Sequence, residues 1–464
     1  MSQMPPSRHL PSLLAMIIFM QMLDTTILNT ALPLIARDLQ QSPLNMQLAV
    51  VAYALTLALL MPLNAWLCDR FGTRKVVFVS LLIFVLGSVL CASAPNLPFL
   101  VFGRVIQGLG GAMLTSAPRL VMVKAYAKSD LLRIINFIIM PALIGPILGP
   151  VLGGYLAEYA SWHWIFLINV PIGAFAAWLT LRILPDFYHS GSHALHFDKW
   201  GFVLFGGGAM GFSLAMELAH RPHSAVNAML VASGALLAWW AYYRHAKHSP
   251  QPLYGLDLFQ VRTFRLGLWG NLISRLGISA MPFLLPLLLQ VGLGHRASIA
   301  GLALAPVALA AIVVKPWVAP LMLRWGYRRV LSYNTRIIGC LIASLAFLPP
   351  NLPVLWLVPP LFVLGACNSI QFSGMNSITI ADLRDHQNSS GTSLMAVNQQ
   401  LAVGLGIALG ATTLQLFSQY MGSARIHEAF RYTFVCVGLC TFLSSWIFAR
   451  LHWRDGANLV KNQT

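Results

Sequence analysis

The chain has 464 residues, of which 57% are hydrophobic and only 9% are charged. Because soluble proteins carry about 25% charged residues, this composition excludes a soluble enzyme, a disordered protein and a secreted disulfide scaffold. The formal net charge is +17, which in a soluble protein would indicate nucleic-acid binding. In a chain this apolar, the basic residues are instead expected in loops on one side of a membrane, and no nucleic acid is expected as a partner.

Long apolar segments recur along the whole chain. A membrane-spanning helix needs about 20 apolar residues, and these runs are continuous, whereas β-barrel strands alternate apolar and polar residues. The sequence therefore predicts an all-α membrane protein with fourteen transmembrane helices, at residues 11–34, 46–67, 76–95, 98–122, 133–157, 163–184, 200–219, 226–243, 266–292, 298–322, 330–349, 353–376, 391–417 and 431–450.

The first apolar segment is expected to be a retained span. Only one basic residue, Arg8, precedes it, the segment contains Asp24, and no convincing cleavage site follows. A signal peptide is therefore disfavoured. An even number of spans places both termini on the same side of the membrane.

Lysine and arginine in the short loops indicate which side that is. Twenty of the 30 basic residues fall in the two tails and in the loops on the same side as the tails. Five fall in the opposite loops, and five are assigned within spans: Arg104, Arg119, Arg275, Lys315 and Arg336. This asymmetry predicts cytoplasmic termini.

The sequence carries a signal of internal duplication. The order arginine, aromatic residue, glycine, any residue, arginine, basic residue occurs in Arg70–Lys75, after the second span, and again in Arg324–Arg329, after the tenth. Two six-helix halves around a central cavity form a known transporter plan. The predicted domains are an N-terminal six-helix bundle at 1–184, an inserted helix pair with flanking cytoplasmic loops at 185–262, and a C-terminal six-helix bundle with a cytoplasmic tail at 263–464.

Asp24 in the first span is a candidate functional charge, because a carboxylate within a membrane is costly and marks a functional site by default. Burial favours the neutral form of a carboxyl group, whereas a nearby cation favours the charged form. A site that alternates between these environments loads and releases a proton. The alternative is a static structural ion pair.

The loop after the second span carries Asp69, Arg70, Gly72 and Arg74, which are predicted to take part in conformational gating. Gly72 permits a tight turn, and Asp69 is expected to engage a helix N-terminus or a basic neighbour in one conformation. The alternative is an ordinary positive-inside loop, which the second occurrence of the pattern disfavours.

In the fourth span, Arg104 is predicted to reach toward Asp24 and to modulate its ionisation. The small residues that follow it, within Gly108–Ala112, allow another helix to approach closely. A structural arginine that only makes hydrogen bonds is the alternative.

The fifth span carries glycines at every fourth position, which form one smooth face, together with prolines that bend the helix. Such a close, kinked contact is suited to sealing and reopening a cavity. The helix is therefore predicted to have a gating role rather than a packing role alone, and the residues concerned are Gly145, Pro146, Gly149, Pro150, Gly153 and Gly154.

Arg275 in the ninth span lies roughly where the second half of the chain matches Asp24. Because charges at this depth face the interior of a helix bundle, Arg275 is the best candidate for a substrate anchor. Lys315 and Arg336 are expected either to extend toward the cytoplasmic face or to line the cavity. The substrate cavity is predicted to contain Arg275, Asn29, Gln107 and Asn271.

Signals for an enzyme or a metal site are weak. The six cysteines lie in or beside apolar segments without a CxxC pair and are interpreted as packing residues. His189, His193 and His196 have metal-compatible spacing, but they lack an HExxH context and a solvated loop is the favoured interpretation. The sequence contains neither a P-loop nor a GxSxG motif, so no cofactor and no metal is expected.

Together these segments resemble the major facilitator superfamily, in its fourteen-helix drug/proton antiporter branch of the EmrB/QacA type, and in particular the bacterial MdtD/HsrA-like members. Two departures are Ala65, where the loop motif usually begins with glycine, and His163, where the branch commonly has arginine. The similar segments correspond to the span-one signature, the loop motif, the span-four motif, the antiporter motif and the span-six signature: Leu23–Pro33, Ala65–Lys75, Arg104–Ala112, Gly145–Gly154 and Trp162–Gly173.

The resemblance implies alternating access, in which proton entry drives export of a small molecule, with Asp24 as proton carrier and Arg104 as its partner. It implies a monomeric multidrug antiporter for small amphipathic compounds in the bacterial cytoplasmic (inner) membrane, in contact with membrane lipids. The alternative is a transporter of anionic amphiphiles or metabolites anchored by Arg275, because five basic residues and one central acid lie within spans. A membrane-embedded enzyme and a channel are disfavoured.

Overall fold

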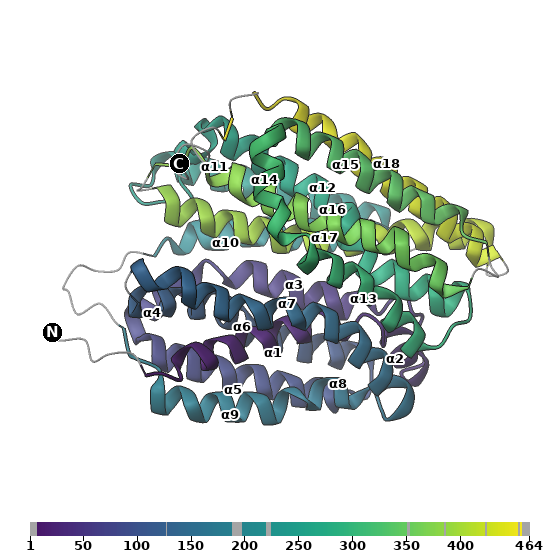
Figure 1. The fold of residues 1–464 in the computed structure, drawn as a ribbon, viewed down its shortest axis with the longest axis horizontal. Coiled ribbons are helices and arrows are strands. Elements are labelled where there is room, and N and C mark those ends of the chain that lie inside the picture. The colour runs from purple at the N-terminus through teal and green to yellow at the C-terminus, as the bar shows by residue number, and fades with distance from the viewer. Residues whose placement is uncertain are drawn as a thin grey trace. The chain divides into compact units, whose positions relative to one another are not determined.

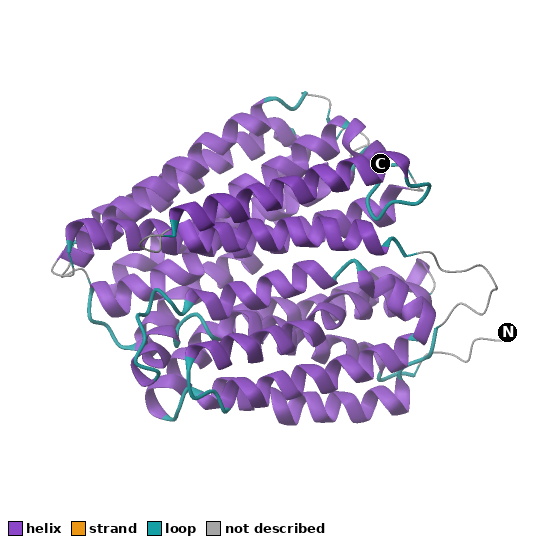
Figure 2. Cartoon of the chain, turned by 180° about the vertical axis from the view of Figure 1, so that it is seen from behind, coloured by secondary structure: helices purple, strands orange, loops and turns teal. Residues whose placement is uncertain are grey.

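The computed structural model describes residues 7–126, 128–187, 197–219, 224–349, 353–384, 387–422, 425–452 and 455–456. These residues form helices joined by loops and contain no strand (Figure 2). Ten helical segments among them are long and apolar enough to cross a membrane, and the number rises to twelve if each of two bent helix pairs is one span. The predicted all-helical membrane fold is confirmed, whereas the number of fourteen spans stays a prediction.

The chain divides into two compact units. One comprises Met1–Phe197 together with Arg296–Ala305, and the other comprises Asp198–His295 together with Pro306–Thr464. The helix α13 (Ala297–Val313) therefore begins in the first unit and ends in the second. The three-part division expected from the sequence stays a prediction.

The first unit is a helical bundle that contains both long and short helices (Figure 1). Its helices are α1 (Leu10–Ile27), α2 (Leu32–Asp38), α3 (Gln47–Leu60), α4 (Leu63–Phe71), α5 (Thr73–Ala92), α6 (Leu97–Ala125), α7 (Lys128–Tyr159), α8 (His163–Leu167) and α9 (Asn169–Ile183). α1 packs against α7, α3 packs against α6, and α5 packs against both α6 and α9. Buried apolar side chains fill the bundle, including Leu14, Tyr53, Phe84 and Ala117.

Caps, prolines and one glycine set the ends of these helices. Asn96 precedes α6, and its side-chain oxygen accepts a hydrogen bond of 2.9 Å from the backbone N–H of Phe99, which satisfies a free donor of the first turn. α3 and α4 meet at a bend of 59° just before Pro62, which cannot donate a backbone hydrogen bond. α4 ends at Gly72, whose φ of 86° favours glycine.

The second unit contains the remaining helices. They are α10 (Lys199–Ala219), α11 (Ala225–His248), η1 (Leu256–Gln260), α12 (Arg262–Leu287), η2 (Leu288–Gly292), α14 (Lys315–Trp325), α15 (Tyr327–Ser344), η3 (Leu345–Phe347), η4 (Val354–Leu357), α16 (Val358–Ile380), α17 (Asn388–Met421) and α18 (Ile426–Ala449). α10 packs against α11, α12 packs against α17 and α18, and α15 packs against α18.

The backbone geometry around the first loop motif recurs in the second unit. α13 and α14 meet at a bend of 57°, and α14 ends at Gly326 with a φ of 77°. These values are close to the bend of 59° and the φ of 86° at Gly72. The repeated sequence pattern therefore corresponds to a repeated structure, in which a bent helix pair ends at a glycine turn.

A carboxylate fastens the α10–α11 hairpin to the segment that leads to α12. Asp198, just before α10, accepts hydrogen bonds from the backbone N–H groups of Gly201 (2.8 Å) and Leu253 (3.0 Å). His245, in the last turn of α11, places its Nε2 2.7 Å from the same carboxylate. One side chain thus joins the beginning of α10, the end of α11 and the connection to α12.

Candidate functional site

Asp24 lies in the last turn of α1 and is buried, with a relative exposure of 1%. The hydroxyls of Thr25 and Thr26 donate to backbone carbonyls one turn earlier, those of Gln21 (2.8 Å) and Met22 (3.1 Å). Such bonds compete with the helical pattern and weaken or bend a helix. The two threonines therefore weaken the last turn of α1, which ends at Ile27, three residues after the carboxylate.

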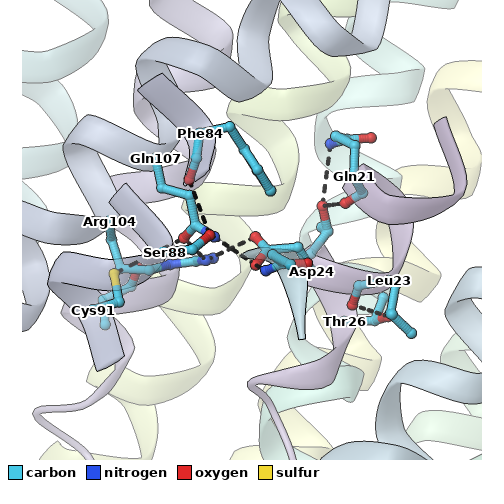
Figure 3. A network of polar contacts seen from close by, with 12 residues as sticks. Gln21, Leu23, Asp24, Thr26, Phe84, Ser88, Cys91, Arg104 and Gln107 are labelled. Carbon is cyan, nitrogen blue, oxygen red and sulfur yellow. Dashed lines mark hydrogen bonds and ion pairs between the residues drawn. The ribbon is translucent and has the colours of Figure 1, made fainter. Parts of the chain in front are cut away.

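Side chains from two other helices donate three hydrogen bonds to Asp24. Arg104 of α6 forms a salt bridge, with Nη1 2.9 Å from Oδ2 (Figure 3). Gln107 Nε2, also of α6, and Asn169 Nδ2, at the beginning of α9, lie 2.7 and 2.8 Å from Oδ1. All three donor side chains are fully buried. The structure thus places Arg104 where the sequence predicts it, against Asp24.

Further contacts hold Arg104 in place. Its Nε donates to the backbone carbonyl of Ala49 (3.2 Å), and its guanidinium lies over the ring of Tyr53, 4.0 Å from the centroid. Its Nη1 also lies 2.6 Å from Gln107 Oε1, and Gln107 Nε2 donates to Ser88 Oγ of α5 (2.9 Å). The network therefore joins α1, α3, α5, α6 and α9.

This geometry favours an ionised Asp24. A carboxylate only accepts hydrogen bonds, whereas a protonated carboxyl group must donate one. The side chains that contact the two oxygens of Asp24 here are donors. The two charges are buried together, so removing one would leave the other uncompensated, at a cost of about 3–5 kcal/mol.

Some members of the network differ from the expected site. The sequence predicts Gln107 as a cavity residue, whereas in the structure Asp24, Arg104 and Ser88 engage its amide. Asn169, Tyr53 and Ser88 are not among the predicted residues. An asparagine in an apolar span was the available signal for Asn169. The predicted cavity residue Asn29 follows α1, is 5% exposed, and its Oδ1 has no hydrogen-bond partner among the described residues.

The glycine face of α7 packs against α1 beside Asp24. Gly145, Gly149 and Gly153 stand on successive turns of α7, and none leaves room for a side chain. A Cβ atom at these glycines would meet four residues of α1, namely Met22, Leu23, Thr26 and Ile27. The helix that carries the predicted gating motif therefore touches the helix that carries the buried carboxylate.

The other predicted gating residues of α7 lie along the same helix. Thr30, which follows α1, donates from Oγ1 to the carbonyl of Pro150 (3.0 Å). Gly154 faces the backbone of Ala297, at the beginning of α13 within the first unit. Pro146 lies inside α7. The motif therefore contacts α1 and the first part of α13 from one helix.

The predicted gating loop is tied to neighbouring elements. Asp69 forms an ion pair of 2.7 Å with Lys124 at the end of α6, which is the basic neighbour expected for it. Arg74 Nε donates to the backbone carbonyl of Leu184, after α9 (2.7 Å). The guanidinium of Arg70 lies over two aromatic rings of α4, 5.3 and 5.6 Å from their centroids.

Arg275 of α12 has a different environment from Arg104. Its guanidinium lies over the ring of Phe372 in α16, 4.5 Å from the centroid. Within the described part of the chain its Nε has no hydrogen-bond partner and no acidic side chain pairs with it. Asn271, four residues earlier on the same helix face, leaves both polar side-chain atoms without partners there. These two predicted cavity residues thus form an unsatisfied polar pair.

The remaining candidates are the three loop histidines, Lys315 and Arg336. Among the described residues there is no group of three or more His, Cys, Asp or Glu side chains that could hold a metal ion. The loop residues His189, His193 and His196 lie outside the described residues. Lys315 and Arg336, whose orientation the sequence leaves open, line two separate cavities of the second unit.

Comparison with known proteins identifies the family. Residues 14–407 match the profile of the Major Facilitator Superfamily. The chain belongs to this superfamily. It is 38% identical over 457 residues to the probable transport protein HsrA of Haemophilus influenzae, with 98% of each chain covered. It is 40% identical over 440 residues to the putative multidrug resistance protein MdtD of Pectobacterium atrosepticum, with 93% of each chain covered.

Solved structures of other transporters share the major facilitator fold at low sequence identity. The peptide transporter POT in complex with sulfate has a TM-score of 0.70 at 14% identity, covering 97% of this chain and 98% of that one. The D-xylose–proton symporter has a TM-score of 0.67 at 14% identity, covering 96% and 98%. The family and these relatives make the chain a multi-pass membrane transporter of small molecules and not an enzyme.

Proposed function

We propose that this major facilitator protein is a proton-coupled antiporter that exports small amphipathic compounds by alternating access. The observation that carries the proposal is the buried network around Asp24, in which three donors from α6 and α9 hold one carboxylate. A proton carrier must exchange between a charged state that protein donors stabilise and a neutral state. In this structure the protein donors surround Asp24 and stabilise its charged state. In the proposed cycle, α1 separates from the donors of α6 and α9, and the neutral state of Asp24 is then favoured.

Coupling of protonation to movement follows from the packing of α7. The glycines of α7 meet α1 on the turns that flank Asp24, so a shift of α1 away from Arg104 also changes the contact with α7. Interfaces packed this closely switch between discrete arrangements rather than deform gradually. In the proposed cycle, proton binding to Asp24 releases α1 from Arg104. The movement of α1 then changes its close contact with α7, which is proposed to close and reopen the substrate cavity.

The proposed architecture has fourteen spans in the bacterial cytoplasmic membrane, with both termini in the cytoplasm and a monomer as the working unit. The helices α7 and α10, of 32 and 21 residues, would complete fourteen spans with the twelve that meet the length and composition criteria. The division at 1–184, 185–262 and 263–464 is kept in this proposal. Twenty of 30 basic residues on the side of the tails support the orientation.

Transport by purified protein in liposomes tests the proposal. With an imposed pH gradient, the native chain should move an amphipathic substrate such as ethidium against its concentration gradient, and Asp24→Asn should abolish this uphill transport. The matched control is Asp38→Asn, since Asp38 lies outside the network and its carboxylate accepts a hydrogen bond from Trp162 Nε1 (2.7 Å) that an asparagine oxygen can also accept. Unchanged uphill transport by Asp24→Asn would refute the assignment.

A second candidate function, transport of anionic amphiphiles or metabolites, is favoured by Arg275. The Nε of Arg275 is buried without a hydrogen-bond partner among the described residues, which is costly for a charged group, and a substrate carboxylate or phosphate would compensate the charge, with Asn271 as an additional hydrogen-bonding group. The test compares an anionic dye such as fluorescein with ethidium. Arg275→Ala should abolish transport of the anion while Arg275→Lys retains part of it. If the substitution changes only ethidium transport, the anion hypothesis fails.

A further inference from the structure

A second cavity in the molecule has the chemistry of an anion site. It has a volume of about 690 Å³ and lies within the second unit, where α14 ends, α15 begins and α18 ends. Its lining contains four arginines, two aromatic residues and one buried hydroxyl group, and the residues that form it are Arg324, Trp325, Gly326, Arg328, Arg329, Ser332, Tyr333, Arg336 and Ala449.

The arginines of this cavity lack acidic partners. Arg324, Arg328 and Arg329 are exposed, and no ion pair or hydrogen bond to their guanidinium groups is present in the described part of the chain. Arg336 is half-buried, donates from Nε to Ser445 Oγ (3.2 Å) and lies over the ring of Tyr333. Four positive charges thus surround one hollow without internal compensation, which favours an anionic ligand with more than one acceptor oxygen.

A buried hydroxyl group points to a ligand independently of the charges. Ser332 is 8% exposed, lines the cavity, and its Oγ has no hydrogen-bond partner among the described residues. Buried polar groups are normally hydrogen-bonded. A ligand oxygen in the cavity would satisfy this hydroxyl.

In the corresponding loop of the first unit, charged side chains have partners within the protein. There Asp69 pairs with Lys124, and Arg74 donates to the Leu184 carbonyl. In the repeated pattern the position of Asp69 is taken by Leu323, which is 42% exposed. The second loop therefore keeps the basic residues of the pattern and lacks its acid.

We propose that this cavity binds the headgroup of an anionic phospholipid from the cytoplasmic leaflet. The choice of a lipid rests on the apolar surface beside the charges: Trp325 and Tyr333 are each 59% exposed, and Trp446 is 62% exposed. Tryptophan and tyrosine prefer the membrane–water interface, and basic pockets between spanning helices bind anionic headgroups. The phosphate contacts the arginines and Ser332, while the acyl chains lie along the exposed aromatic and aliphatic residues.

Lipid titration of the purified full-length protein tests this site. The thermal unfolding midpoint is followed in detergent while phosphatidylglycerol, phosphatidylcholine or inorganic phosphate is added, and native mass spectrometry counts retained lipids. We expect phosphatidylglycerol alone to raise the midpoint and to stay bound. Arg328→Gln/Arg329→Gln should raise the half-saturating lipid concentration about tenfold or more, the loss expected for two basic residues at an anionic headgroup.

The matched control is Arg182→Gln/Arg244→Gln. Both residues are exposed arginines at helix ends that lie over tryptophan rings outside the cavity, so this variant should bind phosphatidylglycerol like the native chain. If Arg328→Gln/Arg329→Gln does not fold, the single variants make the same comparison. Equal stabilisation by phosphatidylcholine or by inorganic phosphate, native-like binding by the double variant, or an equal loss in the control would each overturn the lipid assignment. None of these readouts depends on proton coupling.

Discussion

The contacts of Arg104 require the shape of a guanidinium group. Its Nε donates to Ala49, its Nη1 lies between Asp24 and Gln107, and its face covers Tyr53. A lysine ammonium is a single point charge and cannot make this planar set of contacts at once. The residue therefore does more than neutralise Asp24, since it also fixes the direction from which the carboxylate is approached.

Charge compensation between Asp24 and Arg104 gives a prediction at this scale. Arg104→Leu leaves a buried carboxylate without its cation and should destabilise the protein by about 3–5 kcal/mol. Adding Asp24→Asn removes the orphaned charge, so the double variant should be clearly more stable than Arg104→Leu alone. Thermal or denaturant unfolding of the four proteins in a double-mutant cycle measures the coupling. Additive losses from the two substitutions would contradict the buried pair.

At the scale of elements, α7 lies against α1 so closely that glycine is required at the contact. A Cβ atom at Gly149 would meet the side chain and backbone of α1 at Thr26 and Ile27, and backbone moves only with the whole helix. The same type of small-residue packing lets membrane helices approach one another without a hydrophobic driving force.

Gly149→Ala should therefore lower both stability and transport. The added methyl group forces α7 away from α1, with an expected cost of about 1–3 kcal/mol. Gly207 of α10 is the matched control, because nothing lies within 4 Å of a Cβ atom there. Gly207→Ala should leave the unfolding midpoint unchanged or raise it slightly. Equal effects of the two substitutions on midpoint and transport rate would rule out the specific contact.

The anchoring of the α10–α11 hairpin has a pH dependence with a definite sign. Burial raises the pKa of Asp198, but the backbone donors Gly201 and Leu253, together with His245, outweigh it and hold the pKa below its usual value. A group with a depressed pKa in the folded state contributes stability above its unfolded pKa, near 3.9, and loses it as the pH falls through the lower folded value.

Asp198→Asn should consequently be less stable than the native chain at pH 7, by about 1 kcal/mol. The difference should shrink as the pH falls below about 4, where the carboxyl group of the unfolded chain takes up its proton first and the native carboxylate follows at its lower pKa. Thermal unfolding of both proteins between pH 3 and pH 7 gives the comparison. A difference that grows toward acidic pH would have the wrong sign for this contact.

At the scale of the whole molecule, hydropathy was sufficient to predict the helical membrane fold, because a lipid environment leaves the backbone few alternatives. The pairing of Asp24 with Arg104 was also accessible, since few charges occur in spans and each needs a partner. The contact between Asn169 and Asp24 could not be predicted, because the two residues lie 145 positions apart and nothing in the sequence around Asn169 indicates its partner. The packing of α7 against α1 could not be predicted either. It depends on how each helix is rotated about its own axis, which the spacing of apolar residues does not determine.

The two units also differ in how they treat their buried charge. In the first, three donors hold Asp24 and Arg104 pairs with it, although the Nη2 of Arg104 has no hydrogen-bond partner among the described residues. In the second, Arg275 and Asn271 keep unpartnered atoms within the described residues.

Proton movement during substrate efflux is the most direct test of the central claim that Asp24 carries the coupled proton. Liposomes containing the purified protein, a lumenal pH dye and a transported substrate are diluted into substrate-free buffer. For the native chain, substrate leaving the lumen should draw protons in and acidify it. With Asp24→Asn, substrate efflux should proceed without any change in lumenal pH. Lumenal acidification by Asp24→Asn equal to that of the native chain would contradict the account.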